Sequence, residues 1–535
     1  MKPLAQLSRQ LPDPATLEEL ANKLKQKYTV QDTPTQTTNL NFYDSFDWRL
    51  YSKDILCFEQ HNRLYLTDLI GCELTPSLPL AGKKIRFHQE LPVSALQEKI
   101  KPLLEMRALL LQSSFSQTTW QLRILNKDEK TVVMITCSER HEAGQQDKQN
   151  EQNEQQDEQP ICSVRLQEVR GYEKWFQRVE QDLQEFGIPM PCTKEQELRI
   201  ALAGKGRTPK DYTSKFSVML KPEMDGLTAT KAIYRDLLTT MQANEQGILD
   251  DLDSEFLHDF RVAIRRTRSG LSMLKKVMEP DITARFAQDF RHLGKITGPV
   301  RDLDVYLLME EDYKARLPAH LQKGLRYFFD DLATQRTEEQ AKLVKALRSS
   351  EYTTIINDWE EYLKKENNTE DTEGAEEATQ PTEKPPKAAK RIDKIANTII
   401  QKRFQRVLRD GQAITPDSPD ESLHRLRIQG KKLRYSLEFF SSLYPSKEMK
   451  YLIKQLKNLQ NNLGLFNDLS VQQDMLNAYL DELKPNSTKS QQISAAIGGL
   501  LTNLYHEQQQ VRCEFEETFR CFSSGENISL YEKII

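Results

Sequence analysis

Hydrophobic and polar positions follow different patterns in two parts of the chain, with the change near residue 215. Before it, β-branched and aromatic runs with partial alternation, such as TVVMITCSE (131–139), predict strands bounded by turn residues. Other runs, such as ATLEELANKLKQKY (15–28), have helical spacing instead. Residues 1–215 are therefore predicted to form an α+β domain on a largely antiparallel sheet.

After about residue 220 the strand signals end. Nearly every segment from Thr228 to Glu517 has helical periodicity, with short breaks such as Gly298-Pro299 and Tyr444-Pro445. We therefore expect an all-α domain over residues 218–525, in halves of about 218–364 and 388–525. The helix of the second half that begins near residue 419 has a strong start signal: Ser418 as N-cap, Pro419 at the first position and Glu421 completing a capping box.

Two low-complexity segments interrupt these patterns. Residues 142–160 (EAGQQDKQNEQNEQQDEQP) contain almost nothing that could enter a core, and they lie between two strand-like runs. They are predicted to be a solvated insertion in a hairpin. Residues 366–387 are rich in Asp and Glu and contain Pro-Pro, which predicts a flexible acidic linker between the two helical halves.

The helical part contains an internal repeat. LHDFRVAIRRTRSGL (257–271) aligns with LHRLRIQGKKLRYSL (423–437) at an offset of 166 residues. At the same offset, and without a gap, GPVRDLDV (298–305) aligns with GLFNDLSV (464–471), so each copy has a matching Gly turn. Two blocks in constant register indicate a duplicated helical unit with pseudo-two-fold symmetry.

Helical geometry places basic residues on one face of each copy. At about 100° per residue, the four basic positions of each block fall in one arc beside an apolar arc. Arg266 and Lys432 point away from the basic arc. The basic arcs contain His258, Arg261, Arg265 and Arg268, and His424, Arg427, Lys431 and Arg434; the apolar arcs contain Phe260, Ile264, Leu271 and Leu274, and Leu426, Leu433, Leu437 and Phe440.

Local charge supports a ligand for these faces, although the whole chain has a net charge of −4. Residues 257–301 contain ten Lys and Arg against four Asp and Glu, and residues 423–457 contain nine against two. Adjacent cations on a helix repel each other, and arginine forks suit phosphate oxygens. A single charged stripe is usually a solvated face; two in register favour a bound polyanion. Asp302 and Asp468 are expected to orient a basic residue or cap a helix, and the two histidines fit equally well as hydrogen-bonded helix residues.

Both copies resemble the CHAD family, whose halves carry H-x-x-R-[VI]-x-x-[RK]-[RK]-x-R. His258 to Arg268 and His424 to Arg434 fit this pattern, and the resemblance spans roughly residues 218–525. It implies two helical bundles related by a pseudo-two-fold axis, with a basic groove or channel that binds inorganic polyphosphate. The candidate polyphosphate-binding residues are His258, Arg261, Arg265, Arg266, Arg268, Arg291, Lys295, Arg301, His424, Arg427, Lys431, Lys432, Arg434, Lys454 and Lys457.

The first 215 residues resemble a degenerate CYTH domain, the triphosphate-tunnel fold, through NFYDSFDWRLYSKDILCF (41–58). The metal-binding E-x-E-x-K strand of that family is absent from residues 1–40, and CFEQHNRLYL keeps only Arg63 of its basic strand. Because phosphoryl hydrolysis of this kind needs carboxylates that hold a divalent metal, we expect no triphosphatase activity, no catalytic residues, no metal site and no cofactor. Five cations could line a residual tunnel or lie on the surface: Arg49, Lys53, Arg63, Arg107 and Arg123.

The expected function is non-catalytic binding of inorganic polyphosphate, with targeting to polyphosphate granules. A divergent triphosphatase and a nucleic-acid-binding protein are the alternatives; the missing acidic strand counts against the first, and the scarcity of aromatics beside the basic arcs, where only Tyr435 occurs, counts against the second. The seven scattered cysteines and the absence of an apolar stretch of 18 residues indicate a cytoplasmic protein without a membrane partner.

Overall fold

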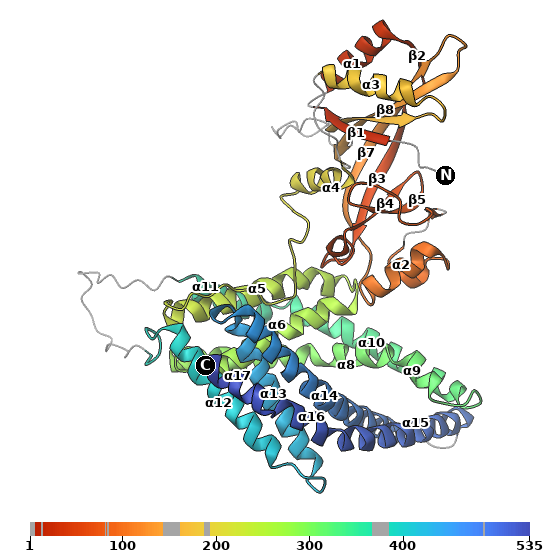
Figure 1. Cartoon of the computed structure of the whole chain (residues 1–535). Helices are drawn as coiled ribbons and strands as arrows, with labels where there is room; N and C mark the ends of the chain where they lie inside the picture. Colours follow the sequence, from red (N-terminus) through yellow and green to blue (C-terminus); the bar gives the residue numbers. More distant parts are fainter. Residues whose placement is uncertain are drawn as a thin grey trace. The chain divides into compact units, whose positions relative to one another are not determined.

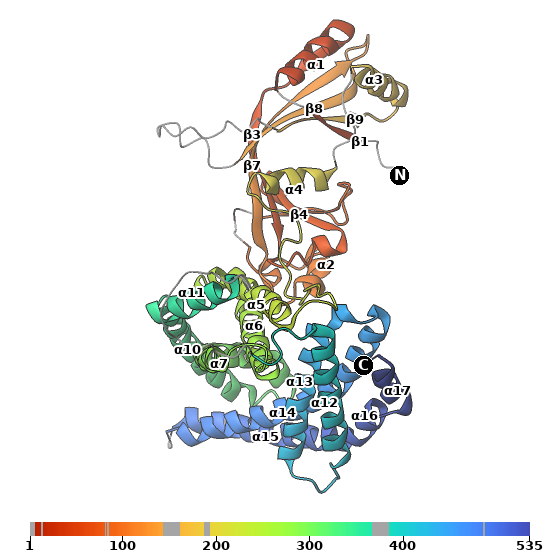
Figure 2. The ribbon, with the colours of Figure 1, turned by 90° about the vertical axis from the view of Figure 1, so that its left-hand side faces the viewer.

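The computed structural model describes residues 6–11, 14–80, 82, 85–142, 161–186, 193–365, 385–484 and 487–534. Most of the predicted insertion at 142–160 and of the predicted linker at 366–387 lies outside the described residues. The chain forms two compact units, Met1–Thr213 and Ser214–Ile535, shown in Figures 1 and 2. Within the described ranges, no helix combines the length and the apolar content needed to cross a bilayer.

The N-terminal unit is built on one antiparallel sheet, as predicted. Every strand pairing in the described residues is antiparallel, in the order β1-β9-β8-β7-β3-β4-β5-β6, and β2 pairs with β7. The predicted hairpin around the low-complexity insertion is confirmed, because β8 and β9 pair directly. The strands are β1 (Gln6–Leu11), β2 (Thr29–Asp32), β3 (Gln36–Asp44), β4 (Ile55–Gln60), β5 (Arg63–Asp68), β6 (Leu78–Pro79), β7 (Leu110–Leu125), β8 (Thr131–Glu142) and β9 (Ile161–Glu168).

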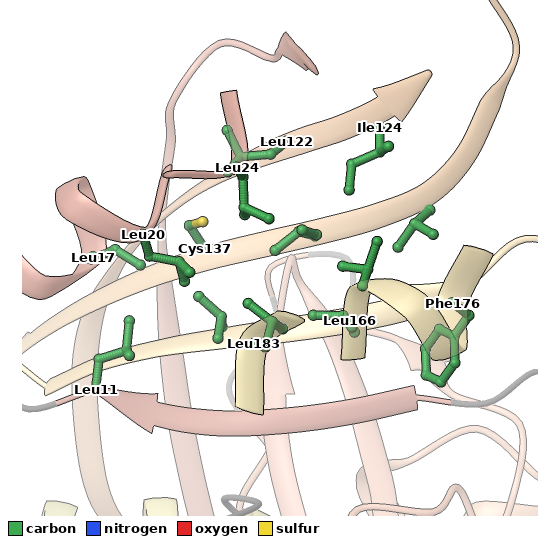
Figure 3. Close-up of a cluster of buried hydrophobic side chains, with 14 of the residues drawn as sticks. Leu11, Leu17, Leu20, Leu24, Leu122, Ile124, Cys137, Leu166, Phe176 and Leu183 are labelled. Atoms are coloured by element: carbon green, nitrogen blue, oxygen red, sulfur yellow. The ribbon is translucent and has the colours of Figure 1, made fainter. Parts of the chain in front are cut away.

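Helices cover this sheet with apolar faces. Leu17, Leu20 and Leu24 recur at helical spacing on α1 (Pro14–Lys27), and all three are buried. Figure 3 shows them with Phe176 and Leu183 of α3 (Glu173–Glu185), packed over side chains of β7, β8 and β9. The remaining helices of the unit are η1 (Tyr51–Lys53), η2 (His88–Glu90), α2 (Ala95–Leu104) and α4 (Lys194–Ala203).

The regular elements among the described residues of the second unit are all helices, as predicted, apart from one isolated bridge between Asp225 and Arg391. Its first half contains α5 (Gly226–Leu249), α6 (Ser254–Met273), α7 (Pro280–Ile296), α8 (Gly298–Leu307), α9 (Glu310–Ala315), α10 (Gln322–Leu347) and α11 (Ser350–Lys364). Its second half contains α12 (Ile392–Gln412), α13 (Asp420–Phe439), η3 (Ser441–Leu443), α14 (Ser446–Glu482), α15 (Thr488–Cys513), α16 (Phe515–Phe522) and α17 (Gly525–Ile534).

The internal repeat extends to the helix boundaries. The starts of α5, α6 and α7 precede those of α12, α13 and α14 by the same 166 residues that separate the sequence blocks. In both copies the central helix packs on the helices before and after it, and α6 and α13 also contact each other. The apolar arcs predicted for α6 and α13 are confirmed, because all eight of their residues are buried. The basic arcs therefore face away from the cores of their own halves.

The two copies differ at the predicted Gly turns. In the first copy the chain breaks between α7 and α8 at Gly298, where Pro299 lacks the N–H that a continuous helix would need. The second copy has Leu465 at the position of Pro299, and α14 continues through Gly464 without a break. The turn predicted at Gly464 is therefore wrong.

The predicted start of α13 is also corrected. The helix begins at Asp420, and Pro419 takes the N-cap position without a side-chain cap. The Ser418 hydroxyl accepts a hydrogen bond from the backbone N–H of Thr415 at 2.9 Å, so it serves the preceding turn and not the helix. The capping box with Glu421 does not form, because a proline at the N-cap places Ser418 one residue too early to reach the first free amides.

Candidate functional site

The basic faces of α6 and α13 line two cavities. The smaller one has a volume of about 410 Å³ and receives Arg261 and Arg265 from α6 and Arg427 from α13. The other residues that line it are His258, Arg301, Asp302, Val305, Tyr306, Met309, Asp468, Val471 and Gln472. Both repeats therefore contribute cations to the smaller cavity, from α6 and α13, which contact each other.

The larger cavity has a volume of about 740 Å³ and also takes residues from both repeats. Arg265 lines both cavities, and we call the two together the basic cleft. The cations of the larger cavity are Arg265, Arg268, Lys275, Arg291, Lys431 and Lys432. Its other lining residues are Ser269, Leu271, Ser272, Pro280, Thr283, Ala284, Ala287, Ile428 and Tyr435.

Two arginines at equivalent repeat positions are held in place by their own halves. Arg261 Nη1 donates hydrogen bonds to the carbonyl oxygen of Gly294 at 3.1 Å and to Thr297 Oγ1 at 3.0 Å. Arg427 Nη2 donates to Asp468 Oδ1 at 3.1 Å. These contacts fix each guanidinium at the wall of the smaller cavity while leaving other N–H groups of its fork for a ligand.

The two aspartates predicted to orient basic residues act on these arginines. Burial lowers the pKa of Arg427 and of Arg261. The negative charge of Asp468 opposes this shift for Arg427, and the charge of Asp302 opposes it for Arg261. Burial raises the pKa of Asp302, and Arg261 and Arg301 oppose this rise. The Lys and Arg residues that line the basic cleft outnumber these two aspartates.

The electrostatics of the basic cleft join the two repeats. Burial is the largest cause that lowers the pKa of Arg427, and Arg265 of the other repeat lowers it further. Burial, followed by the charges of Arg427 and Arg265, lowers the pKa of Lys431 to about 8. The pKa of Lys432 is lowered by burial and then by Arg403 and Arg406. Cations from both halves therefore repel each other across the cleft.

Nine of the fifteen predicted site residues line the basic cleft: His258, Arg261, Arg265, Arg268, Arg291, Arg301, Arg427, Lys431 and Lys432. Lys432 does so although its helical angle points away from the basic arc. The other six are outside the linings of both cavities: Arg266, Lys295, His424, Arg434, Lys454 and Lys457. Of these, Lys295, Lys454 and Lys457 are exposed on their helices.

Three of the six residues outside the cleft have structural partners. Arg266 Nη2 and Arg434 Nε donate to the two oxygens of Glu438, at 3.0 Å and 2.7 Å. This carboxylate thus bridges cations of both repeats. His424 Nδ1 lies 2.7 Å from Asn467 Oδ1, which is the hydrogen-bonded helix role that the sequence left open.

Lys275 lines the larger cavity but was missed in the sequence. It lies seven residues after Arg268, so helical periodicity predicts one common face, but α6 ends at Met273 and Lys275 lies in the turn that follows. The repeat hid that signal, because the equivalent position in the second copy is Ser441. Thr283, Ala284 and Ala287 of α7 carry no charge pattern, and only the packing of α7 on α6 brings them to the cavity wall.

The N-terminal unit has a polar cavity of about 420 Å³ on its sheet. Of the five cations considered for a residual tunnel, Arg123 lines this cavity. Arg140, Arg165 and Lys194 line it too, and the sequence did not indicate them. The other four lie elsewhere: Arg49 and Arg107 approach Asp47, Arg63 bonds Ser77, and Lys53 is exposed.

A buried ion network stands beside this N-terminal cavity. Arg140 Nη2 donates to Glu197 Oε1 at 3.0 Å, and Lys194 Nζ donates to Glu197 Oε2 at 2.7 Å, with all three side chains buried. The residues that line the cavity include no carboxylate, as far as the structure describes the chain. The described residues likewise contain no group of three or more His, Cys, Asp or Glu arranged to hold a metal ion.

Comparisons with known proteins identify the helical unit. Residues 232–477 match the model of the CHAD domain family. The solved CHAD domain from the plant Ricinus communis is 25% identical, with a TM-score of 0.46 over 56% of this chain and 96% of that one. PptA from Streptomyces chartreusis is 15% identical, with a TM-score of 0.42 over 55% of this chain and 99% of that one.

A third solved structure is of HpAC1 from Hippeastrum, described as a putative adenylyl cyclase with a dominant triphosphatase activity. It is 12% identical, with a TM-score of 0.26 over 39% of this chain and 100% of that one. A search of curated proteins found no match. Because all three TM-scores lie below 0.5, the assignment rests on the family match, which covers both copies of the basic motif. The helical unit of this chain contains a CHAD domain.

Proposed function

We propose that this chain binds inorganic polyphosphate in the basic cleft without hydrolysing it. The observation that carries the proposal is the position of Arg265, which lines both cavities and repels Arg427 and Lys431 of the other repeat. A folded protein keeps these neighbouring cations together at a cost in stability, and the ion pair of Arg427 with Asp468 offsets only part of it. A polyanion that enters the cleft replaces this repulsion with attraction.

The chemistry of the cleft favours a long anion with closely spaced charges. Guanidinium groups donate paired hydrogen bonds to phosphate oxygens, and both cavities offer them. Because Arg265 belongs to both cavities, a chain of phosphates that runs past it contacts cations from both repeats. The CHAD resemblance implies inorganic polyphosphate as this anion.

Nucleic acid is the competing polyanion. Proteins that bind single strands without sequence preference stack successive bases on aromatic side chains. Among the described residues that line the basic cleft, the aromatic ones are Tyr306 and Tyr435, one in each cavity. Two separated tyrosines do not form a platform for successive bases, so the cleft favours a polymer that consists of phosphate alone.

The proposal that the chain is not a hydrolase concerns the N-terminal unit. A divalent metal on a triphosphate needs oxygen ligands, mainly carboxylates. Glu197, a buried acid beside the N-terminal cavity, is already paired with Arg140 and Lys194. Release of phosphate from triphosphate by the full chain in the presence of Mg²⁺ or Mn²⁺ would contradict this part. We further propose cytoplasmic polyphosphate granules as the place where the chain acts.

A competition titration tests the polyphosphate proposal. Fluorescently labelled long-chain polyphosphate is bound to the full chain and displaced with unlabelled polyphosphate, orthophosphate or single-stranded DNA, at two salt concentrations. We expect polyphosphate to compete best and its affinity to fall with added salt, because the cations act on an anionic polymer. If single-stranded DNA competes as well as polyphosphate at the higher salt concentration, the proposal fails.

A charge-matched pair of variants locates the site. Arg265→Glu places an anion where both cavities meet and should weaken polyphosphate binding at least tenfold, since it removes a charge-assisted contact worth roughly 1.5–3 kcal/mol and adds repulsion. Lys345→Glu changes the net charge equally on the exposed face of α10, away from the cleft. Equal affinity losses in the two variants would show that only the overall charge matters.

A further inference from the structure

The larger cavity contains a surface that an inorganic chain does not need. Beside its cations it is lined by Leu271, Pro280, Ala284, Ala287 and Ile428. Its volume of about 740 Å³ lies within the range of about 300–1,000 Å³ typical of small-molecule sites. Such sites combine an apolar wall with a few polar groups that fix the ligand's orientation. Phosphate oxygens gain nothing from an apolar wall.

A buried hydroxyl on the same wall has no partner. Thr283 is 8% exposed, and its Oγ1 makes no hydrogen bond to any described residue. Buried polar groups are nearly always hydrogen-bonded, so an unpaired one at a cavity wall points to a ligand or water that supplies the missing bond. Thr283 can donate or accept this bond. A ligand that satisfies it carries a heteroatom within its apolar part.

An aromatic ring and several cations also line the larger cavity. Tyr435 of α13 is partly buried and lines the larger cavity with Ile428, two turns earlier on the same helix. Arg268, Lys431 and Lys432 line the cavity as well. A ligand that uses all these features has a flat heteroaromatic ring and several negative charges close together.

We propose that the larger cavity binds a nucleoside polyphosphate. The base lies against Tyr435 and Ile428 and forms a hydrogen bond with Thr283. The phosphates contact the cations near Arg265, which lines both cavities. A prenyl diphosphate also carries clustered phosphate charges but has no ring heteroatom for Thr283, so the hydroxyl favours a nucleotide. The proposal goes beyond polyphosphate binding, and because the two ligands share cations, each is expected to displace the other.

Equilibrium dialysis of the full chain without divalent metal tests the proposal. The ligands are ATP, inorganic triphosphate, adenosine and a prenyl diphosphate. We expect ATP to bind at least fivefold more tightly than inorganic triphosphate, because base stacking on an aromatic ring adds affinity. Adenosine alone should bind weakly. Equal affinity for ATP and inorganic triphosphate, or a prenyl diphosphate that binds more tightly than ATP, overturns the proposal.

Variants assign the binding to this cavity. Tyr435→Ala and Thr283→Val should each reduce the preference for ATP over triphosphate, and Thr283→Val does so without opening a void because the two side chains have similar shapes. Tyr505→Ala is the matched control, since Tyr505 is 52% exposed on α15. If neither cavity variant lowers the preference more than Tyr505→Ala does, the site is wrong.

Long-chain polyphosphate, measured on the same variants, separates this inference from the proposed function. Tyr435→Ala and Thr283→Val should change polyphosphate affinity less than twofold, and Arg265→Glu should weaken both ligands. A chain that prefers ATP but does not bind polyphosphate rejects the polyphosphate proposal alone. A chain that binds polyphosphate but treats ATP and triphosphate alike rejects the nucleotide site alone.

Discussion

At the scale of single residues, burial and neighbouring positive charges both lower the pKa of a lysine in the basic cleft. Burial disfavours a lysine ammonium, and Arg427 and Arg265 disfavour it further, so the pKa of Lys431 falls to about 8. An arginine in the same surroundings keeps its proton at neutral pH. Lys431 is therefore a cleft cation whose charge depends on pH in the physiological range, with Asp468 partly opposing and Arg434 adding to the shift.

This pKa predicts a pH dependence of ligand binding. In the free protein Lys431 loses its proton as the pH rises through about 8, whereas a bound polyanion favours the protonated form. We expect polyphosphate affinity to fall between pH 7 and pH 9 and binding at pH 8 to take up protons, which calorimetry in buffers of different ionisation enthalpy measures. Lys431→Arg keeps the charge, so its affinity should change less over this range. An equally steep fall in Lys431→Arg would assign the effect to another group.

A second residue-scale prediction concerns the buried network of the N-terminal unit. Burial alone would raise the pKa of Glu197, but Arg140 and Lys194 outweigh it and hold the pKa at about 2. Glu197→Gln leaves two buried cations without a counterion and should destabilise the unit by roughly 3–5 kcal/mol at pH 7. Thermal unfolding measures this loss, with Glu185→Gln on the exposed face of α3 as the control.

The pH dependence of the same network follows from the direction of the pKa shift of Glu197. The pKa of Glu197 is lowered from an unfolded value of about 4.3, so its contribution is fully present above pH 4.3 and is lost as the pH falls toward 2. The difference in unfolding temperature between the wild type and Glu197→Gln should therefore shrink below pH 4. A difference that stays constant down to pH 2 would contradict the role of the charge.

The pairing of charges limited what the sequence could predict at this scale. Helical angles correctly separated Arg266 from the basic arc, and Arg266 does pair with Glu438. The same rule misjudged Lys432, which lines the larger cavity because α13 contacts α6 and brings its neighbouring face to the cleft. A helical angle gives only the direction in which a side chain leaves its own helix. The position of the neighbouring helix determines whether that direction leads into the cleft.

At the scale of elements, the repeat was the most informative pattern. The motif blocks gave the offset, and α5 and α12, which share little obvious sequence, obey it as well. The sequence also contained the reason for the difference at the Gly turns, since Pro299 ends helical hydrogen bonding and Leu465 does not. The prediction at Gly464 failed because a glycine alone does not end a helix when its neighbours favour helical structure and pack on both sides.

This difference between the copies can be tested by exchanging the residue. Leu465→Pro removes a backbone hydrogen bond inside α14 and should destabilise the helical unit by roughly 3 kcal/mol. It should also weaken polyphosphate binding, because Asp468, which lies beyond the kink, holds Arg427 at the wall of the smaller cavity. Leu465 is 43% exposed, so Leu465→Ala should cost much less and is the control. Unchanged thermal unfolding of Leu465→Pro would mean that α14 tolerates the break seen in the first copy.

At the scale of the whole molecule, the sequence predicted the α+β and all-α parts and the division of the helical part into two copies. It could not show that the copies share a cleft, because cations on separate helices meet only through the packing of α6 on α13. Three cations of the N-terminal cavity were missed for the same reason. Arg140, Arg165 and Lys194 lie on β8, β9 and α4, and only the strand register and the packing of α4 bring them together.

A cleft built from two repeats predicts how many ligands one chain holds. If a single polyphosphate spans both copies, Arg261→Gln and Arg427→Gln should each lower its affinity about tenfold, since each removes a charged hydrogen-bond donor from one wall. Calorimetric titration with a short polyphosphate of uniform length should give one site per chain in the wild type and in both variants. Two independent patches would behave differently: each variant would remove one of two sites and leave the affinity of the other unchanged. The double variant then measures the coupling between the two arginines. If both contact one ligand, the loss of binding free energy in the double variant should be smaller than the sum of the two single losses.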